Sequence, residues 1–436
     1  MTRYVVLALV LSAACTKRVN ECAADSDCAV PYPFCDVNGE FPASGGVANV
    51  CTVVPADCSA ERCGCIPNAT TCTDQTLSVC NADGKSESTT ACALGCSPDN
   101  TRCAAFTPSN GLGNALAMAE NEPDIEFPPE VEVTDGGDIF ELPSNAPVVV
   151  KSILVTQVGV PSIRVYIGRS FKIHAGLLQA VSRDTSNPIA FVASGPITID
   201  GNLDAAFPIR LGYFGPGSQL ASAPCAGVAD NHGGGGGGNA TPGGYGAPKA
   251  QLPAAPGSPG GASQPTSLFE PLVGGCPGGG YKGLAGGNGG AALEFVSLKT
   301  ISISGTLNVG GAGGTEGTGG ASGGNIVLEA PVVSIAGTIA ANGGAGGATG
   351  FGGSGGSSNL MPAPGVGDST TNPPTLSGSG GTALQAPGTG ADPRIDTGAG
   401  GGGAVGRLQI MTSDGSYQHD TGIFSVKVTT GMLARK

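Results

Sequence analysis

The fold is decided by residues 301–307, which read ISISGTL, and by residues 333–339, which read VSIAGTI. Each stretch is followed by a glycine-rich run, and the two corner glycines, Gly305 and Gly337, are 32 residues apart. Apolar residues alternate with small polar ones in both stretches, which is the period-two pattern of a half-buried strand. The sequence therefore predicts a repeated rung that consists of a strand, a glycine corner, a short strand and a glycine loop.

A third copy of the rung lies at residues 197–203, which read ITIDGNL. In a stack of rungs about 4.8 Å apart, equivalent apolar residues form inward-pointing columns, because one rung cannot bury its apolar face alone. Glycine suits each corner if the chain there needs positive φ. Superposing the corner glycines predicts four columns: Ile197/Ile301/Val333, Ile199/Ile303/Ile335, Leu203/Leu307/Ile339 and, nine positions before each glycine, Val192/Val296/Leu328.

Further strands surround these three copies. Residues 163–167 and 171–173 alternate with period two, and residues 148–158 are rich in β-branched side chains. A last rung is predicted at residues 405–411, and residues 423–428 are expected to form a terminal strand that caps the stack. The fold class that follows is mostly β, with a parallel β-solenoid as its larger part.

Long glycine-rich inserts separate the rungs at residues 212–290, 310–324 and 343–404. They are too poor in side chains to form a conventional core. Two interpretations remain open: the inserts are disordered, or they lie as extended strands against one face of the solenoid. Cys225 and Cys276 lie near the two ends of the largest insert, and we expect a disulfide between them that closes its base.

The first residues have the character of an export signal. Residues 1–14 combine a basic residue, a short apolar core and small residues before Cys15, and the apolar core is too short to span a bilayer. The ending resembles a bacterial lipoprotein signal, which implies that Cys15 carries a lipid, although Ser12 stands where such signals usually have Leu. We therefore expect a membrane-anchored lipoprotein of the outer membrane or cell surface. The alternative is an ordinary cleaved signal and a freely secreted protein.

Residues 15–103 form a cysteine-rich head, in which two sub-modules at 16–55 and 56–103 each hold an even number of cysteines after Cys15. In an exported chain, this density predicts disulfides of undetermined connectivity. A zinc site is the rival interpretation, but the head lacks paired Cys-x2-Cys knuckles and histidine. No metal or cofactor is predicted. The disulfide candidates in the head are Cys22, Cys28, Cys35, Cys51, Cys58, Cys63, Cys65, Cys72, Cys80, Cys92, Cys96 and Cys103.

Residues 104–145 are acidic and contain several prolines, which favours an extended spacer. Residues 110–120 are the one helical candidate in the chain. The solenoid is then expected to occupy residues 146–436.

Composition excludes some functions. The formal charge is −13, tryptophan is absent and no basic stripe is present, which argues against a nucleic-acid partner. Matches to Gly-x-Ser-x-Gly at residues 320–324 and 352–356 follow from low complexity, because no helical pattern accompanies them. The main enzyme alternative is a polysaccharide lyase or hydrolase, which needs paired carboxylates or a carboxylate and a base on one face. Its candidates are Asp200 and Asp204, with Arg183 or Arg210 nearby; solvated corner acids are the competing interpretation.

The layout and short phrases of the chain resemble those of glycine-rich exported proteins and lipoproteins of myxobacteria and their relatives. The resemblance rests on residues 92–96 (CALGC), Cys103, residues 108–112 (PSNGL) and the repeats at 326–344. It covers nearly the whole chain and supplies no catalytic residue. The rung pattern alone also resembles right-handed parallel β-helix proteins of the pectin-lyase-like architecture.

The expected function is therefore structural or adhesive and not catalytic. The protein is expected to be anchored to a membrane through an N-terminal lipid and to present its glycine-rich loops to a polysaccharide or a surface protein. Two alternatives remain open: a β-helix enzyme that acts on polysaccharide, and a module that binds a protein partner through the cysteine-rich head.

Overall fold

The structure is a computed structural model, and the chain divides into two compact units, residues 1–104 and 105–436. No helix among the described residues is long and apolar enough to cross a membrane. The described residues are 22–23, 27–28, 34–36, 48–52, 65, 68–81, 86–92, 94–97, 99–174, 177–181, 187–206, 215–247, 257–265, 269–348, 352–358, 360–368, 375–391, 398–419 and 421–435.

The first unit contains two small antiparallel sheets. One pairs β1 (Phe34–Asp36) with β2 (Val50–Thr52), and the other has the order β3 (Thr70–Thr73), β4 (Thr76–Cys80) and β5 (Glu87–Ala91). Every residue of β5 is exposed. The buried apolar residues described in this unit are cysteines and Leu94, so disulfides form most of its interior.

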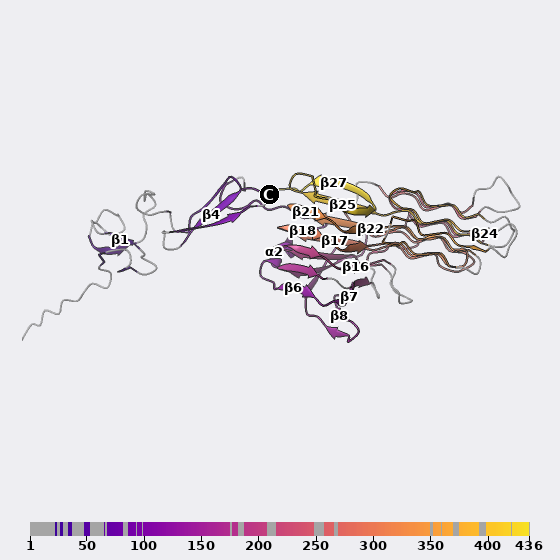
Figure 1. Ribbon diagram of the computed structural model, residues 1–436, viewed down its shortest axis with the longest axis horizontal. Helices are drawn as coiled ribbons and strands as arrows, with labels where there is room; N and C mark the ends of the chain where they lie inside the picture. Colours follow the sequence, from indigo (N-terminus) through magenta and orange to yellow (C-terminus); the bar gives the residue numbers. More distant parts are fainter. Residues whose placement is uncertain are drawn as a thin grey trace, which may run out of the picture. The chain divides into compact units, whose positions relative to one another are not determined.

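The second unit consists mainly of three sheets in which neighbouring strands come from successive repeats (Figure 1). Most neighbouring strands pair in parallel; the antiparallel pairs lie at one end of two of the sheets. The seven-stranded sheet has the order β10 (Lys151–Val155), β11 (Ile163–Gly168), β14 (Ile189–Ala193), β17 (Ala292–Ser297), β20 (Asn325–Glu329), β25 (Arg407–Thr412) and β27 (Lys427–Met432). The five-stranded sheet has the order β21 (Val332–Ile335), β18 (Thr300–Ile303), β15 (Ile197–Ile199), β12 (Ser170–Ile173) and β6 (Asp124–Phe127). The eight-stranded sheet has the order β26 (Ile423–Ser425), β22 (Thr338–Ala340), β19 (Thr306–Asn308), β16 (Asn202–Asp204), β13 (Leu177–Val181), β7 (Glu130–Thr134), β8 (Ile139–Glu141) and β9 (Ala146–Pro147).

The register confirms three of the four predicted columns. In these three columns, Ile301, Ile303 and Leu307 each pair with the expected residue of the preceding repeat and of the following repeat. The fourth column is wrong at its last member, because Val296 pairs with Glu329 and not with Leu328. Val296 precedes Ile301 by five residues, whereas its partner Glu329 precedes Val333 by four, so the register of the preceding strand is shifted by one residue.

The corner glycines are needed for a different reason from the predicted one. Neither Gly305 nor Gly337 takes positive φ. Instead, a Cβ atom on Gly305 would lie 1.9 Å from the carbonyl oxygen of Gly201, and one on Gly337 would lie 1.9 Å from that of Gly305. The corners therefore stack backbone on backbone, which leaves no space for a side chain.

The expected acidic spacer at residues 104–145 is not present. This segment contains the helix α2 (Gly113–Ala119), which lies within the predicted helical range. It also contains strands β6 to β8: β6 pairs with β12, β7 pairs with β13, and β8 pairs with β7. The acidic residues of β6 alternate with Ile125 and Phe127, which are buried in the core. Alternation thus places the charges in solvent, and the like charges do not prevent strand formation.

The core lies between the three sheets and contains a cluster of aromatic rings. Phe191 stacks on Phe295 with ring centroids 5.3 Å apart and contacts the edge of Phe171. The predicted terminal strand is split at the buried Val426 into β26 and β27, which end two different sheets. The predicted last rung at 405–411 corresponds to β25.

The described glycine-rich residues within 215–291, 309–324 and 341–405 pack against one another and are called the glycine bundle here. They run side by side away from the strand ends, toward the hairpin of β23 (Gly367–Asp368) and β24 (Thr375–Leu376) in Figure 1. Their backbone N–H groups donate to carbonyls of neighbouring segments, and a Cβ on Gly236 would lie 1.9 Å from the carbonyl oxygen of Gly402. For these residues disorder is the wrong interpretation, because absent side chains permit backbone packing.

Candidate functional site

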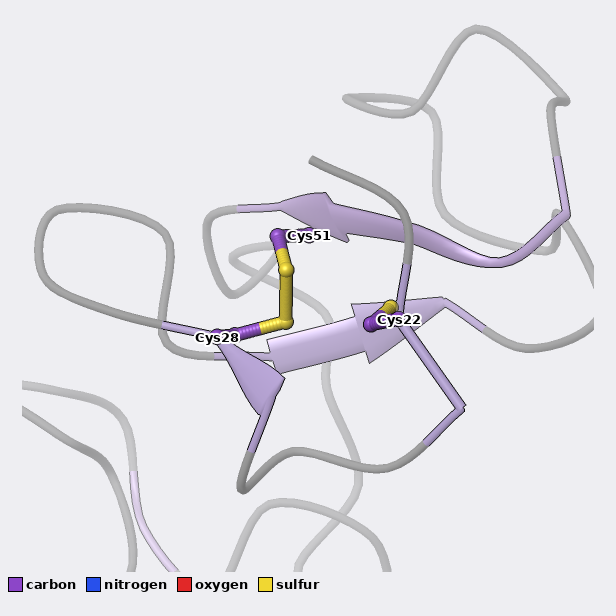
Figure 2. A group of neighbouring side chains, drawn as sticks. All are labelled: Cys22, Cys28 and Cys51. Atoms are coloured by element: carbon purple, nitrogen blue, oxygen red, sulfur yellow. A yellow bond between two sulfur atoms is a disulfide. The ribbon is translucent and has the colours of Figure 1, made fainter. Parts of the chain in front are cut away.

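The cysteine head contains a group whose sulfur atoms could suggest a metal site. The sulfur atoms of Cys22, Cys28 and Cys51 lie within 4.8 Å of one another. Figure 2 shows the disulfide between Cys28 and Cys51. Cys22 forms its own disulfide with Cys35. A disulfide sulfur carries no thiolate charge, so this group is not a ligand set for zinc.

The remaining described cysteines are also paired. The first sub-module closes on itself, as its even cysteine count suggested, and Cys225 is joined to Cys276 as expected at the base of the largest insert. Cys15, Cys58 and Cys63 lie outside the described residues. The other pairs are Cys65–Cys80, Cys72–Cys96 and Cys92–Cys103.

The predicted enzyme candidates have separate environments. Asp200 is partly exposed and lies 3.6 Å from Nδ1 of His174, whose Nε2 contacts the carboxylate of Glu126. These residues lie at the ends of neighbouring strands on an exposed corner. Arg183 and Arg210 lie outside the described residues.

Asp204 is mostly buried and accepts hydrogen bonds from the backbone N–H of Ala206 and the side-chain amide of Asn308. Burial raises the pKa of the Asp204 carboxyl, while these two donors oppose the rise. Asp200 and Asp204 therefore engage different partners, and burial raises the pKa of Asp204.

A different carboxylate pair, Glu294 and Glu329, was missed by the sequence reasoning. Both lie on the face of the seven-stranded sheet that points away from the core, on the neighbouring strands β17 and β20, and both are buried. The missed signal was a single acid in a largely apolar strand: Glu294 within residues 292–297 (ALEFVS) and Glu329 at the end of residues 325–329 (NIVLE). Such a residue needs partners when it is buried.

The partners come from the turn at residues 109–110. The hydroxyl of Ser109 donates to Glu294 Oε1 over 2.9 Å, and the amide of Asn110 donates to Glu294 Oε2 over 2.8 Å. The backbone N–H of Ser109 donates to Glu329 Oε2 over 3.0 Å. Exposed Glu270 accepts from the N–H of Asn110, so three carboxylates surround one turn.

Burial is the main cause of unusual acid–base behaviour here. It raises the pKa of Glu294 well above its ordinary value, with a further rise from the neighbouring Glu329 carboxylate. Burial also raises the pKa of Glu329 to about 7. Glu329 and Glu270 line a cavity of about 400 Å³ together with Gln409 and Met411. A carboxyl of this kind can exchange a proton near neutral pH.

A second cavity lies on the glycine bundle. It is an open groove of about 840 Å³, called the apolar groove here, and residues from segments 218–229 and 277–289 line it. None of the described residues that line it is charged. The side chains of Leu220 and Val228 are 72% and 46% exposed. Exposed apolar surface of this kind is typical of a contact site.

No protein-family model matches this sequence, and comparison with curated proteins and with solved structures found no similar protein. The interpretation of the groove and of the carboxylate pair therefore rests on their own geometry.

Proposed function

We propose that this protein is an exported lipoprotein, anchored through Cys15, with a structural or adhesive role and no catalytic activity. The observation that carries the proposal is the packing of the glycine-rich inserts into a hydrogen-bonded bundle with an uncharged groove at its surface. The disulfides of the head are compatible with an exported protein. The resemblance to glycine-rich exported proteins of myxobacteria is in keeping with both features.

We further infer that the stacked sheets form a right-handed parallel β-solenoid. Successive repeats pair in parallel in all three sheets, as a solenoid requires. Crossovers between parallel strands of one sheet are right-handed in nearly all proteins, which supports the handedness. The solenoid then serves as a scaffold from which the glycine bundle projects.

Attachment assays test the adhesive role. Cells that make the full-length chain are compared with otherwise identical cells that lack it, and their adherence to solid surfaces and to one another is measured. Cells without the protein should adhere less. Equal adherence under all conditions would remove the adhesive role.

Membrane fractionation tests the anchor separately. A Cys15→Ala variant cannot be acylated at this position, so it should leave the membrane fraction. Retention of the variant in the membrane at the level of the unaltered chain would contradict lipid anchoring.

One observation favours the enzyme alternative, namely the raised pKa of Glu329 beside Glu270 in the 400 Å³ cavity. A screen of the purified chain against acidic and neutral polysaccharides tests it, with Glu329→Gln as the decisive variant and Asp200→Asn and Asp204→Asn as controls. We expect no turnover. Turnover that is lost only in Glu329→Gln would replace the proposed function with a polysaccharide lyase or hydrolase.

A further inference from the structure

In the glycine bundle, hydrogen bonds between the same two segments recur every three residues. Gly401 donates its N–H to the carbonyl of Gly234, and Ala404, three residues later, donates to that of Gly237. The residues between them donate to other segments. A repeat of three residues with no internal hydrogen bonds is the geometry of the polyproline II conformation, so each segment can pair with neighbours in three directions.

The segment at residues 285–290 is paired incompletely. Gly287 and Gly290 donate inward, to the carbonyls of Gly319 and Ser322. The N–H groups of four other residues find no acceptor among the described residues: Ala285, Gly286, Asn288 and Gly289. All four line the apolar groove.

The groove therefore has the chemistry of an unfilled position in the bundle. Its lining includes the four residues whose N–H groups have no described acceptor, and the pairs 285/288 and 286/289 have the three-residue spacing that the bundle uses internally. Its walls include Pro224, Pro277 and the exposed Leu220. Asp230 and Lys282 line an adjoining hollow, which shares Ala229, Gly280 and Ala285 with the groove. A matching ligand must supply carbonyl acceptors at three-residue intervals and apolar side chains, and it needs no N–H groups.

We propose that the apolar groove binds a proline- and glycine-rich polypeptide of a partner protein in the polyproline II conformation. Proline lacks an N–H and retains its carbonyl, so a proline-rich segment matches a donor-lined groove. Such a segment is already extended before binding and loses little conformational entropy. This recognition parallels the addition of a strand to a free sheet edge, with a polyproline II segment in place of the strand. The inference rests on the proposed adhesive role and names its partner class.

The test uses the full-length chain and fluorescent peptides. A peptide of about twelve residues with Pro-Pro-Gly repeats is titrated with the protein, and its anisotropy is measured. A flexible Gly-Ser peptide of equal length serves as the comparison. We expect saturable binding of the proline-rich peptide and at least about tenfold weaker binding of the Gly-Ser peptide.

Matched variants locate the site. Ala285 is an exposed alanine in the groove, and Ala386 is an exposed alanine of the bundle outside the groove lining. Ala285→Arg should weaken peptide binding at least about tenfold, because the guanidinium fills an uncharged groove, whereas Ala386→Arg should leave it unchanged. Thermal unfolding checks that both variants remain folded.

Three outcomes would overturn the proposal: absence of saturable binding, equal binding of both peptides, or equal binding by both variants. A fourth outcome would also overturn it: sedimentation analysis shows that the chain self-associates through the surface at Ala285, so that a second copy of the chain occupies the apolar groove. If peptide binding fails while cells still adhere through this protein, the groove proposal falls and the proposed function remains.

Discussion

Glu329 links the protonation state of one buried side chain to the stability of the second unit. The pKa of its carboxyl is raised from 4.5 to about 7 in the folded chain, so the folded state binds more protons than the unfolded state between these values. Stability from this group is greatest below about pH 4.5 and falls as the pH rises to about 7. We expect a loss on the order of 3 kcal/mol across that window.

A Glu329→Gln variant stays neutral and can still accept the Ser109 N–H, so it should lose the part of the decline that Glu329 causes and keep the part caused by the raised pKa of Glu294. Denaturant unfolding of both proteins across the window measures the difference. Glu130→Gln, at an exposed acid of β7, is the matched control and should follow the unaltered chain. Parallel pH dependence of Glu329→Gln and the unaltered chain would show that this carboxyl does not titrate as described.

Gly305 tests the backbone stacking of the corners. Gly305→Ala places a methyl group against the Gly201 carbonyl, which is backbone and cannot rotate away. The free energy of unfolding should fall by about 3 kcal/mol. Gly352→Ala is the control, because its nearest neighbour, the Gly314 oxygen, is 3.8 Å from the added Cβ. Equal unfolding curves for the two variants would contradict the steric explanation.

Arg407 on β25 attaches the largest insert to the stacked sheets. Its buried guanidinium donates to the carbonyls of Asn239, Gln264 and Pro265, and no carboxylate is among these acceptors. Arg407→Met keeps most of the apolar stem and leaves the carbonyls unpaired, so it should cost about 3 kcal/mol.

Hydrogen exchange should show where Arg407→Met acts. Amides in residues 239–247 and 257–265 are expected to exchange faster, while those of β17 and β20 keep their protection. Arg435→Met, at an exposed arginine that donates to the Ser413 carbonyl, is the control and should change neither region. Uniform loss of protection would mean that Arg407 supports the whole unit and not the insert.

The rungs were predictable from sequence because their apolar residues repeat in register and the stacking depends on those residues. Ile301 and Ile303 have equivalents in the neighbouring repeats, and each pairs as superposition predicted. The earlier strand β6 was missed because its acids were interpreted as a solvated spacer. The alternation of these acids with Ile125 and Phe127 was the better signal, because acidic side chains on the solvent face of a strand do not prevent burial of the apolar side chains on its other face.

The glycine bundle and the carboxylate pair were less predictable. Glycine runs give no side-chain pattern from which pairing can be inferred, and the one available signal was their three-residue repeat, as at residues 342–348. Glu294 and Glu329 are recognisable as unusual within apolar strands. Their partners, Ser109 and Asn110, are 184 to 220 residues away in sequence, and a single chain gives no information about that contact.

The two units differ in what maintains their folds. The second unit has a continuous apolar core between three sheets. The first has short strands, an exposed β5 and an interior made largely of cystines. Burial of apolar surface therefore stabilises the second unit, whereas restriction of the unfolded chain by disulfides stabilises the first.

Reduction should consequently separate the units. In the presence of a strong thiol reductant, amides of β3 and β4 in the head should lose protection from hydrogen exchange, because the small sheet cannot remain folded without Cys72–Cys96 and its neighbouring bridges. Amides of β14, β17 and β20 should stay protected, since the core there contains no disulfide. A Cys225→Ala/Cys276→Ala variant isolates the bridge in the second unit and should increase exchange at the base of the insert only. Retained protection in the reduced head would show that its fold does not depend on the disulfides.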